Sequence, residues 1–166
     1  MPQFSGTSIK RLQTCHRYLQ ELFGEVIKHW DCKINEGQRS LSRQGLLLAE
    51  GATLIEFSRH NVTPLSWAVD VLPYPIDWRD LKRFYHLAGI VLGLAASMGI
   101  PIRWGGNWKK STRYLTELKE PQIICSHCKT PVDDELTRKY ASHKGFVDLA
   151  HYELTGPDFK LKGTYI

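Results

Sequence analysis

Residues 67–72 read Trp-Ala-Val-Asp-Val-Leu, an apolar run that a single charge, Asp70, interrupts. The length of the run and its β-branched residues predict a strand. A carboxylate buried in such a strand is unfavourable unless an opposite charge or a metal ion compensates it. Asp70 is therefore expected either to pair with an arginine or to bind a metal ion.

Two other segments place potential metal ligands where a fold does not require them. Ser58-Arg59-His60-Asn61 lies upstream in a predicted loop, and residues 148–154, Asp-Leu-Ala-His-Tyr-Glu-Leu, lie far downstream in a predicted strand. Two histidines and one aspartate, here His60, His151 and Asp70, are a normal protein ligand set for catalytic zinc, which keeps its fourth position open to water.

A hydrolytic zinc site also needs a carboxylate that takes a proton from water and passes it to the leaving amine. Asp148 precedes His151 closely and can serve if the chain bends there. Spacing alone leaves a structural alternative open, in which Asp70 pairs with an arginine while His60 and His151 are ordinary surface or core histidines.

The remaining pattern predicts helices and short strands that do not alternate strictly, which is typical of an α+β fold. We expect a small antiparallel sheet that carries the metal site and helices that back it. The predicted elements are a helix from Ser8 to about His29, a strand at Asp31–Glu36, a helix at Leu41–Glu50, a loop at 57–67, a helix from Asp77 to about Met98, and a strand at Ile102–Trp104.

Composition and charge limit the function classes. The chain has 166 residues, 42% hydrophobic and 23% charged, which fits one globular domain spanning residues 1–166. A net charge of +5 favours anionic partners, but the basic residues are scattered and form no nucleic-acid-binding pattern. The longest apolar stretch, Leu87–Met98, is too short to span a bilayer. The N-terminus lacks the pattern of a signal peptide, so we expect synthesis in the cytoplasm.

Residues 109–145 lack a strong apolar period and are interpreted as a lobe inserted into this domain. The lobe contains Cys125 and Cys128 in a Cys-x-x-Cys motif. Three interpretations stay open: two free thiols in a turn, a structural zinc site, which needs four ligands, and a redox motif without its usual βαβ context. Cys15 and Cys32 fall on apolar spacing and are predicted to lie in the core.

Several motifs, in order along the chain, resemble those of phage endolysins of the zinc L-alanyl-D-glutamate peptidase and D-alanyl-D-alanine carboxypeptidase family. The similar blocks are Glu36-Gly37-Gln38-Arg39-Ser40 with Gln44, Ser58-x-His60-Asn61, Pro64-Leu65-Ser66-x-Ala68-Val69-Asp70-Val71, Pro73-Tyr74-Pro75-Ile76-Asp77-Trp78, Ile102-Arg103-Trp104-Gly105-Gly106-Asn107-Trp108 and Asp148-x-x-His151-x-Glu153-Leu154. Asn107 stands where the family block has Asp, and Tyr152 stands where it has Phe. The stretch between Trp108 and Asp148 is also longer than the resemblance leads us to expect.

The resemblance implies a role for individual residues. The implied ligands of one catalytic Zn²⁺ are His60, Asp70 and His151. Asp148 would be the general base and acid. Arg39 would lie near the substrate carbonyl or carboxylate, where a fixed and always charged guanidinium suits the task.

Two further residues keep two interpretations each. Ser58 would contact the substrate backbone or cap its own loop. Glu153 shares a strand face with His151 and would be either its hydrogen-bond partner or part of a surface salt bridge. Of the five tryptophans, Trp104 and Trp108 flank a glycine pair and are predicted to line a groove, whereas Trp78 is predicted to lie in the core with the others.

The function implied by the resemblance is hydrolysis of peptidoglycan stem peptides for host cell lysis, with an L-alanyl-D-glutamate endopeptidase as the first interpretation. A D-alanyl-D-alanine carboxypeptidase and a non-catalytic wall-binding or virion protein of the same fold are the alternatives. The implied partner is peptidoglycan, not nucleic acid, and a monomer is expected. Such an enzyme is made in the host cytoplasm and acts in the periplasm or cell wall after release.

Overall fold

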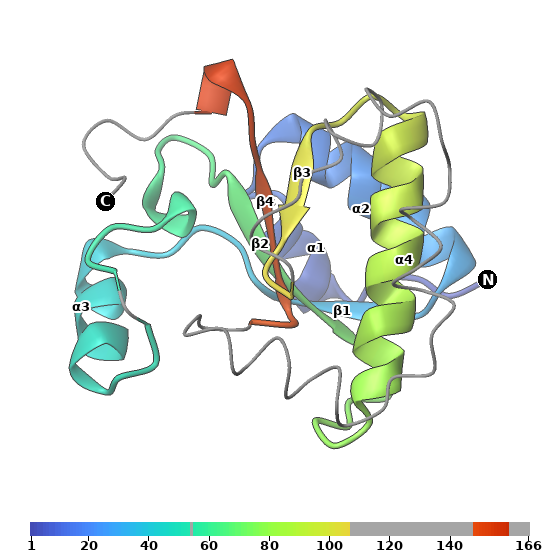
Figure 1. Ribbon diagram of the computed structural model, residues 1–166, viewed down its shortest axis with the longest axis horizontal. Coiled ribbons are helices and arrows are strands. Elements are labelled where there is room, and N and C mark those ends of the chain that lie inside the picture. The colour runs from blue at the N-terminus through green and yellow to red at the C-terminus, as the bar shows by residue number, and fades with distance from the viewer. Residues whose placement is uncertain (54, 107–147, 160–166) are drawn as a thin grey trace.

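The computed structural model describes residues 1–53, 55–106 and 148–159, and its centre is one four-stranded sheet (Figure 1). The strands are β1 (Cys32–Glu36), β2 (Ala68–Pro73), β3 (Ile102–Trp104) and β4 (His151–Leu154). They are ordered β1-β2-β4-β3, and every neighbouring pair is antiparallel. The small antiparallel sheet of an α+β fold is therefore confirmed.

Most of the described helices pack on one side of this sheet. The helices are α1 (Gly6–Leu12), α2 (Arg17–His29), α3 (Leu41–Ala49) and α4 (Leu81–Ser97), with short 3-10 turns η1 (Arg59–Asn61) and η2 (Pro157–Phe159). Side chains from α2, α4 and all four strands form one buried cluster, whereas α3 lies apart at the left of Figure 1. None of the described helices is long and apolar enough to cross a lipid bilayer.

The helix predicted from Ser8 to His29 is two helices. The chain breaks between them because the backbone N–H of His16 donates to the carbonyl of Ser66 and that of Ser66 donates to the carbonyl of Thr14. Nδ1 of His16 then accepts from the backbone N–H of Tyr18 and caps α2. Apolar spacing continued across this break because Cys15 still points into the core, where it is fully buried.

Side-chain alternation gives the sheet two different faces. Val69 and Val71 of β2 join the helix-covered core with Tyr152 and Leu154 of β4. The residues between them must point to the opposite face, because successive side chains of a strand alternate. Asp70 is the cross-strand partner of His151, so two chain segments that are far apart in sequence meet on the uncovered face.

A β-bulge in β1 turns a side chain of a third strand, Glu36, to that face. In β1, Ile34 pairs with Val71, but Glu36 rather than Asn35 pairs with Asp70, so the register shifts by one residue. The extra residue reverses the side of the sheet on which Glu36 would otherwise lie. Glu36 therefore lies beside Asp70 instead of entering the core behind Ile34.

Several other predictions can be checked against the fold. Trp104 does not line a groove: it is buried in the core, with its indole N–H donated to the carbonyl of Leu149 at 2.9 Å. Trp78, predicted to lie in the core, is exposed. Cys15 and Cys32 are buried free thiols. The predicted lobe at 109–145, with Cys125, Cys128 and Trp108, lies outside the described residues.

Candidate metal centre

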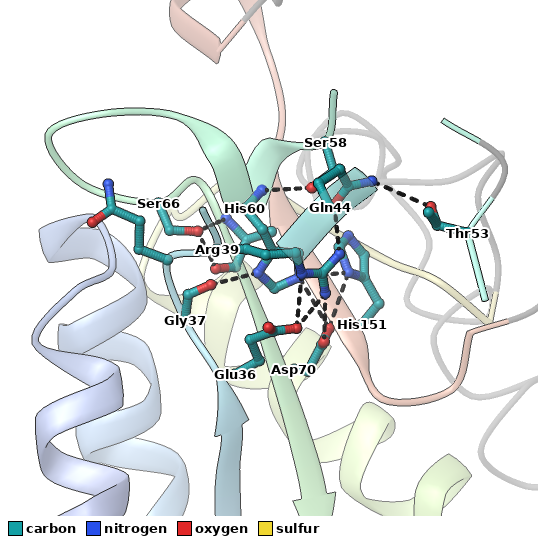
Figure 2. A network of polar contacts seen from close by, with 12 residues as sticks. Glu36, Gly37, Arg39, Gln44, Thr53, Ser58, His60, Ser66, Asp70 and His151 are labelled. Carbon is teal, nitrogen blue, oxygen red and sulfur yellow. Dashed lines mark hydrogen bonds and ion pairs between the residues drawn. The ribbon is translucent and has the colours of Figure 1, made fainter. Parts of the chain in front are cut away.

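Three buried side chains converge on the uncovered face of the sheet. Nε2 of His60 lies 3.1 Å from Oδ1 of Asp70 and 3.2 Å from Nδ1 of His151, and Nδ1 of His151 lies 3.1 Å from the same Oδ1. The three atoms thus form a nearly equilateral triangle (Figure 2). These are the residues of the predicted ligand set, and they form a group that can hold a metal ion.

The loop before β2 fixes the imidazole of His60. Ser58 and Asn61 form a capping box around the 3-10 turn, in which the Ser58 hydroxyl accepts from the backbone N–H of His60 at 3.1 Å. Nδ1 of His60 lies 2.6 Å from the carbonyl oxygen of Gly37. Because a carbonyl can only accept, Nδ1 carries the proton and Nε2 presents its lone pair to the triangle.

Gly37 is required for that contact. A Cβ atom at Gly37 would lie 2.3 Å from the Thr14 hydroxyl and 2.4 Å from the Arg11 carbonyl, both in or beside α1. Any larger residue would push this segment away from α1 and move the carbonyl that orients His60. The Glu36-Gly37 motif in the sequence is therefore explained by close backbone approach as well as by charge.

The imidazole of His151 is fixed by Glu153 on the same strand face. Nε2 of His151 lies 3.0 Å from Oε2 of Glu153, so Nε2 donates and Nδ1 faces the triangle. Arg103, the cross-strand neighbour of Glu153, and Arg59 both form ion pairs with Oε1 of the same carboxylate. Of the two interpretations of Glu153, the structure supports the hydrogen-bond partner of His151.

Asp70 divides its two oxygens between the triangle and Arg39. Oδ1 faces the two histidines, whereas Oδ2 lies 3.4 Å from Nη2 of Arg39. The guanidinium of Arg39 also donates to Glu36 and, through Nη1, to Oε1 of Gln44 at 2.9 Å. The expected arginine partner of Asp70 is therefore present, and it coexists with the histidine pair.

The donor set fits a small divalent cation. Ligands about 2.0–2.2 Å from a tetrahedral Zn²⁺ are about 3.3–3.6 Å apart, slightly more than the observed separations. Both histidines donate their other ring N–H to a carbonyl or carboxylate, which is the usual arrangement of metal-binding histidines. A side-chain set held in this way on two strands and one turn needs little rearrangement to bind a metal ion.

Electrostatics favour ionised carboxylates and a protonated His151 in the protein alone. Burial opposes ionisation of Asp70, but His60 and His151 outweigh burial and hold the pKa of Asp70 well below its usual range. Burial likewise opposes ionisation of Glu153, yet His151, Arg103 and Arg59 lower its pKa to about 2. Burial disfavours a charge on His151, but Asp70 and Glu153 raise its pKa to about 10. A metal ion must therefore displace a proton from His151 on binding.

Asp148 lies beside the triangle but is not a member of the three-residue group. The chain turns immediately before β4, so that the backbone N–H of His151 donates to the carbonyl of Asp148 and the backbone N–H of Ala150 to its carboxylate. This is the bend on which its predicted role depends. Burial, and next the negative charge of Asp70, raise the pKa of Asp148 above the usual range of a carboxyl.

Sequence reasoning missed two residues that hold Arg39 in place. Glu36 and Gln44 were identified only as part of a similar block, without a role. Gln44 is fully buried, and its amide nitrogen donates to the carbonyl of Ile55 at 2.7 Å. Gln44 is buried on an otherwise exposed helix, and buried polar side chains need fixed partners. Its burial, which only the structure shows, is the signal that it holds Arg39.

Replacing Glu153 with glutamine tests the orientation of His151. The variant keeps the shape of the side chain but loses the negative charge shared with Arg59 and Arg103. Metal affinity is expected to fall about 10–100-fold, the usual effect of removing a partner that orients a metal-binding histidine. Competitive chelator titration measures it. Glu25→Gln, which changes a half-exposed glutamate that pairs with Lys28 on α2, is the matched control. Equal affinities in the two variants would contradict the assigned role.

Comparison with known proteins identifies the family of the chain. The family model described as phage L-alanyl-D-glutamate peptidase matches residues 1–130. The L-alanyl-D-glutamate peptidase of Escherichia phage T5 is 26% identical over 122 residues, which cover 70% of this chain and 89% of that protein. The crystal structure of the Serratia marcescens L-Ala D-Glu endopeptidase ChiX is similar in fold, with a TM-score of 0.62 and 21% identity over 92% of this chain and 90% of that one. The chain therefore belongs to the phage L-alanyl-D-glutamate peptidase family and is a peptidoglycan hydrolase.

Proposed function

We propose that this chain is a zinc-dependent endopeptidase that hydrolyses the L-alanyl-D-glutamate bond of peptidoglycan stem peptides. The observation that carries the proposal is the triangle of His60, Asp70 and His151, in which each histidine already donates its second ring N–H to an oxygen acceptor. Family membership supplies the substrate class.

His60, Asp70 and His151 would hold the zinc ion. When bound, zinc supplies a Lewis acid that polarises the scissile carbonyl and lowers the pKa of water. Asp148 takes the proton of the attacking water and passes it to the leaving amine. A raised pKa suits this task, since an acid–base group works best when its pKa is close to the working pH.

The guanidinium of Arg39 has one N–H donor left for a substrate. Of the five N–H donors of a guanidinium, Nε donates to Glu36, Nη2 donates to Glu36 and Asp70, and one N–H of Nη1 donates to Gln44. Within the described part of the chain, the second N–H of Nη1 has no partner. That single donor suits a peptide carbonyl of the substrate.

The charge balance of Arg39 favours an endopeptidase over a carboxypeptidase. A carboxypeptidase must bind the terminal carboxylate of its substrate, which requires a cation that is not already compensated. The positive charge of Arg39 is shared by Glu36 and Asp70, and Arg59 and Arg103 pair with Glu153. The described residues around the triangle thus contribute no uncompensated cation for a substrate carboxylate.

Ser58 is committed to its own loop through the backbone N–H of His60. Its hydroxyl hydrogen is still available to donate, so contact with the substrate backbone stays a prediction. We further expect the enzyme to work as a monomer and to reach the cell wall only after release from the host cytoplasm. These expectations rest on the family and not on a described contact.

Mass spectrometry of digested peptidoglycan tests the proposed function. Purified sacculi treated with the zinc-loaded protein are expected to release peptides that begin with D-glutamate, with the alanine left on the glycan strand. Loss of a terminal D-alanine without a new D-glutamate amino terminus would instead identify the carboxypeptidase. Unchanged sacculi in the presence of zinc would indicate the remaining alternative, a non-catalytic wall-binding protein.

The cysteine pair is expected to be structural. The pair belongs to the inserted region, which lies outside every block that resembles the family, and both two free thiols and a second, structural zinc ion stay open for it. The double variant Cys125→Ser with Cys128→Ser is expected to lower the melting temperature while the folded fraction keeps its turnover. Calorimetry and turnover on the same preparation measure both quantities, and a stable variant without turnover would show that the pair is catalytic.

A further inference from the structure

An exposed aromatic loop, residues 74–78, directly follows β2, the strand that carries Asp70. Tyr74 is 53% exposed, Ile76 37% and Trp78 61%. Three large apolar side chains so exposed within five positions are unusual for a folded surface and commonly mark a binding site.

A line of side-chain contacts connects this loop to the metal centre. The indole of Trp78 stacks on the ring of Phe84, with centroids 5.4 Å apart and planes 25° apart. Phe84 packs in turn with Leu72 and Ala150 in a small cluster of their own, separate from the main core. Leu72 points to the same face of β2 as Asp70, since the two are separated by one residue. The contacts thus lead from the loop to the face of β2 that carries the triangle, which Phe84 of α4 covers at Leu72.

The loop is held in place before any ligand binds. The guanidinium of Arg83 donates to the carbonyl oxygens of Tyr74 and Pro75. The backbone N–H of Tyr74 donates to the carbonyl of Asp31 at 3.0 Å, and the carboxylate of Asp77 accepts from the backbone N–H of Arg79 at 2.9 Å. Rigid aromatic side chains lose little conformational entropy on binding, so this loop suits recognition.

We propose that the exposed aromatic loop binds the glycan strand of peptidoglycan, with an N-acetylated sugar ring against the indole of Trp78. This inference rests on the proposed function. A sugar ring has an apolar C–H face and a polar edge, which match an exposed indole whose chain neighbours, Asp77 and Arg79, are charged.

The chemistry of the substrate places a sugar at this distance. The stem peptide starts on the lactyl group of N-acetylmuramic acid, and the bond to be cut follows the first alanine. A lactyl group and one residue span about 7 Å when extended, after which the sugar rings begin. Tyr74 lies four positions after Asp70, or roughly 13 Å along an extended chain. A disaccharide beyond the lactyl group therefore reaches the loop while the scissile bond lies at the metal centre.

Two substrates with the same scissile bond test the proposal. One is N-acetylglucosaminyl-N-acetylmuramyl-L-alanyl-D-glutamyl-diaminopimelate and the other is the same tripeptide without the two sugars. Trp78→Ala is expected to raise KM for the muramyl substrate about tenfold, the effect of losing a strong interface residue, and to leave the free tripeptide unchanged. Trp78→Phe keeps a ring and should restore most of the difference. Ile9→Ala, which truncates a 45% exposed side chain on α1, is the matched control.

A binding measurement that needs no hydrolysis separates this proposal from the proposed function. Tetra-N-acetylglucosamine is expected to quench tryptophan fluorescence of the wild type and not of Trp78→Ala. If the wild type cleaves neither substrate, the proposed function fails, but this titration still tests whether the loop binds glycan. An equal loss on both substrates, or quenching that survives in Trp78→Ala, would overturn glycan binding. Sedimentation velocity tests the alternative that the loop binds a second copy of the chain. Self-association that disappears in Trp78→Ala would support this alternative and overturn glycan binding.

Discussion

Replacing His60 with alanine is expected to abolish peptidoglycan hydrolysis and to release the catalytic zinc. The imidazole is one of three side chains that form the triangle, and its ring is held from behind by the carbonyl of Gly37. Alanine leaves two ligands, which is too few for a catalytic zinc site that needs three. The same result is expected for His151→Ala, because Asp70 cannot compensate for either ring.

Zinc content and turnover should be measured on one preparation. Atomic emission gives zinc per chain, and the release of new amino termini from sacculi gives turnover. The variants should be made in the Cys125→Ser background as well, so that a second zinc ion does not confuse the count. His29→Ala, an exposed histidine on α2, is the matched control. If the double variant His60→Ala with His151→Ala retained a full equivalent of zinc at this site, the assignment would be wrong.

Replacing Asp148 with asparagine is expected to separate proton transfer from metal binding. Asparagine keeps the shape of the side chain and can still accept from the backbone N–H of Ala150 through its carbonyl oxygen. Zinc content should stay near one equivalent, because Asp148 is not part of the three-residue group. Turnover should fall about 10²–10⁴-fold, the usual contribution of a positioned acid–base group.

The pH profile gives this prediction a second observable. A base must be unprotonated, so turnover rises with pH as Asp148 loses its proton. Burial and the charge of Asp70 raise that pKa, so the acid limb should lie at higher pH than an exposed aspartate would give. In Asp148→Asn the acid limb should flatten. Loss of zinc would make Asp148 a ligand, and retained turnover would make Glu153 the next candidate base.

The chain alone determined the strand that carries Asp70 and named the candidate ligands. An apolar strand tolerates a carboxylate only with compensation, and that local rule needs no tertiary information. The ordered blocks around His60 and His151 then indicated the family and its chemistry. The sequence also predicted most elements to within a few residues, because apolar spacing reports local burial directly.

The helix break at residues 13–16 shows where local patterns fail. Cys15 and Leu19 continue the apolar spacing of one long helix, and both are fully buried. The interruption comes from backbone hydrogen bonds to Ser66, about fifty positions away in the chain. Propensity and periodicity describe one segment at a time and contain no term for such a partner.

Trp78 and Trp104 show the same limit for exposure. Both are large and apolar, so composition alone predicts burial or a groove equally well. The antiparallel pairing of β3 with β4 buries Trp104, whereas the turn after β2 leaves Trp78 on the surface against Phe84. Exposure is decided by the packing of neighbouring elements, and no pattern within residues 73–78 specifies it.

What only the tertiary structure decided is how the ligands are oriented. The sequence named His60, Asp70 and His151, but the ring nitrogens that face the triangle depend on Gly37 and Glu153 as acceptors. The bulge in β1 places Glu36 beside Asp70 and Arg39. It thereby determines how much of the positive charge of Arg39 is compensated before a substrate binds. Hydrogen-bond direction and register are properties of chain segments in contact, because a donor is oriented only by an acceptor that folding brings within about 3 Å.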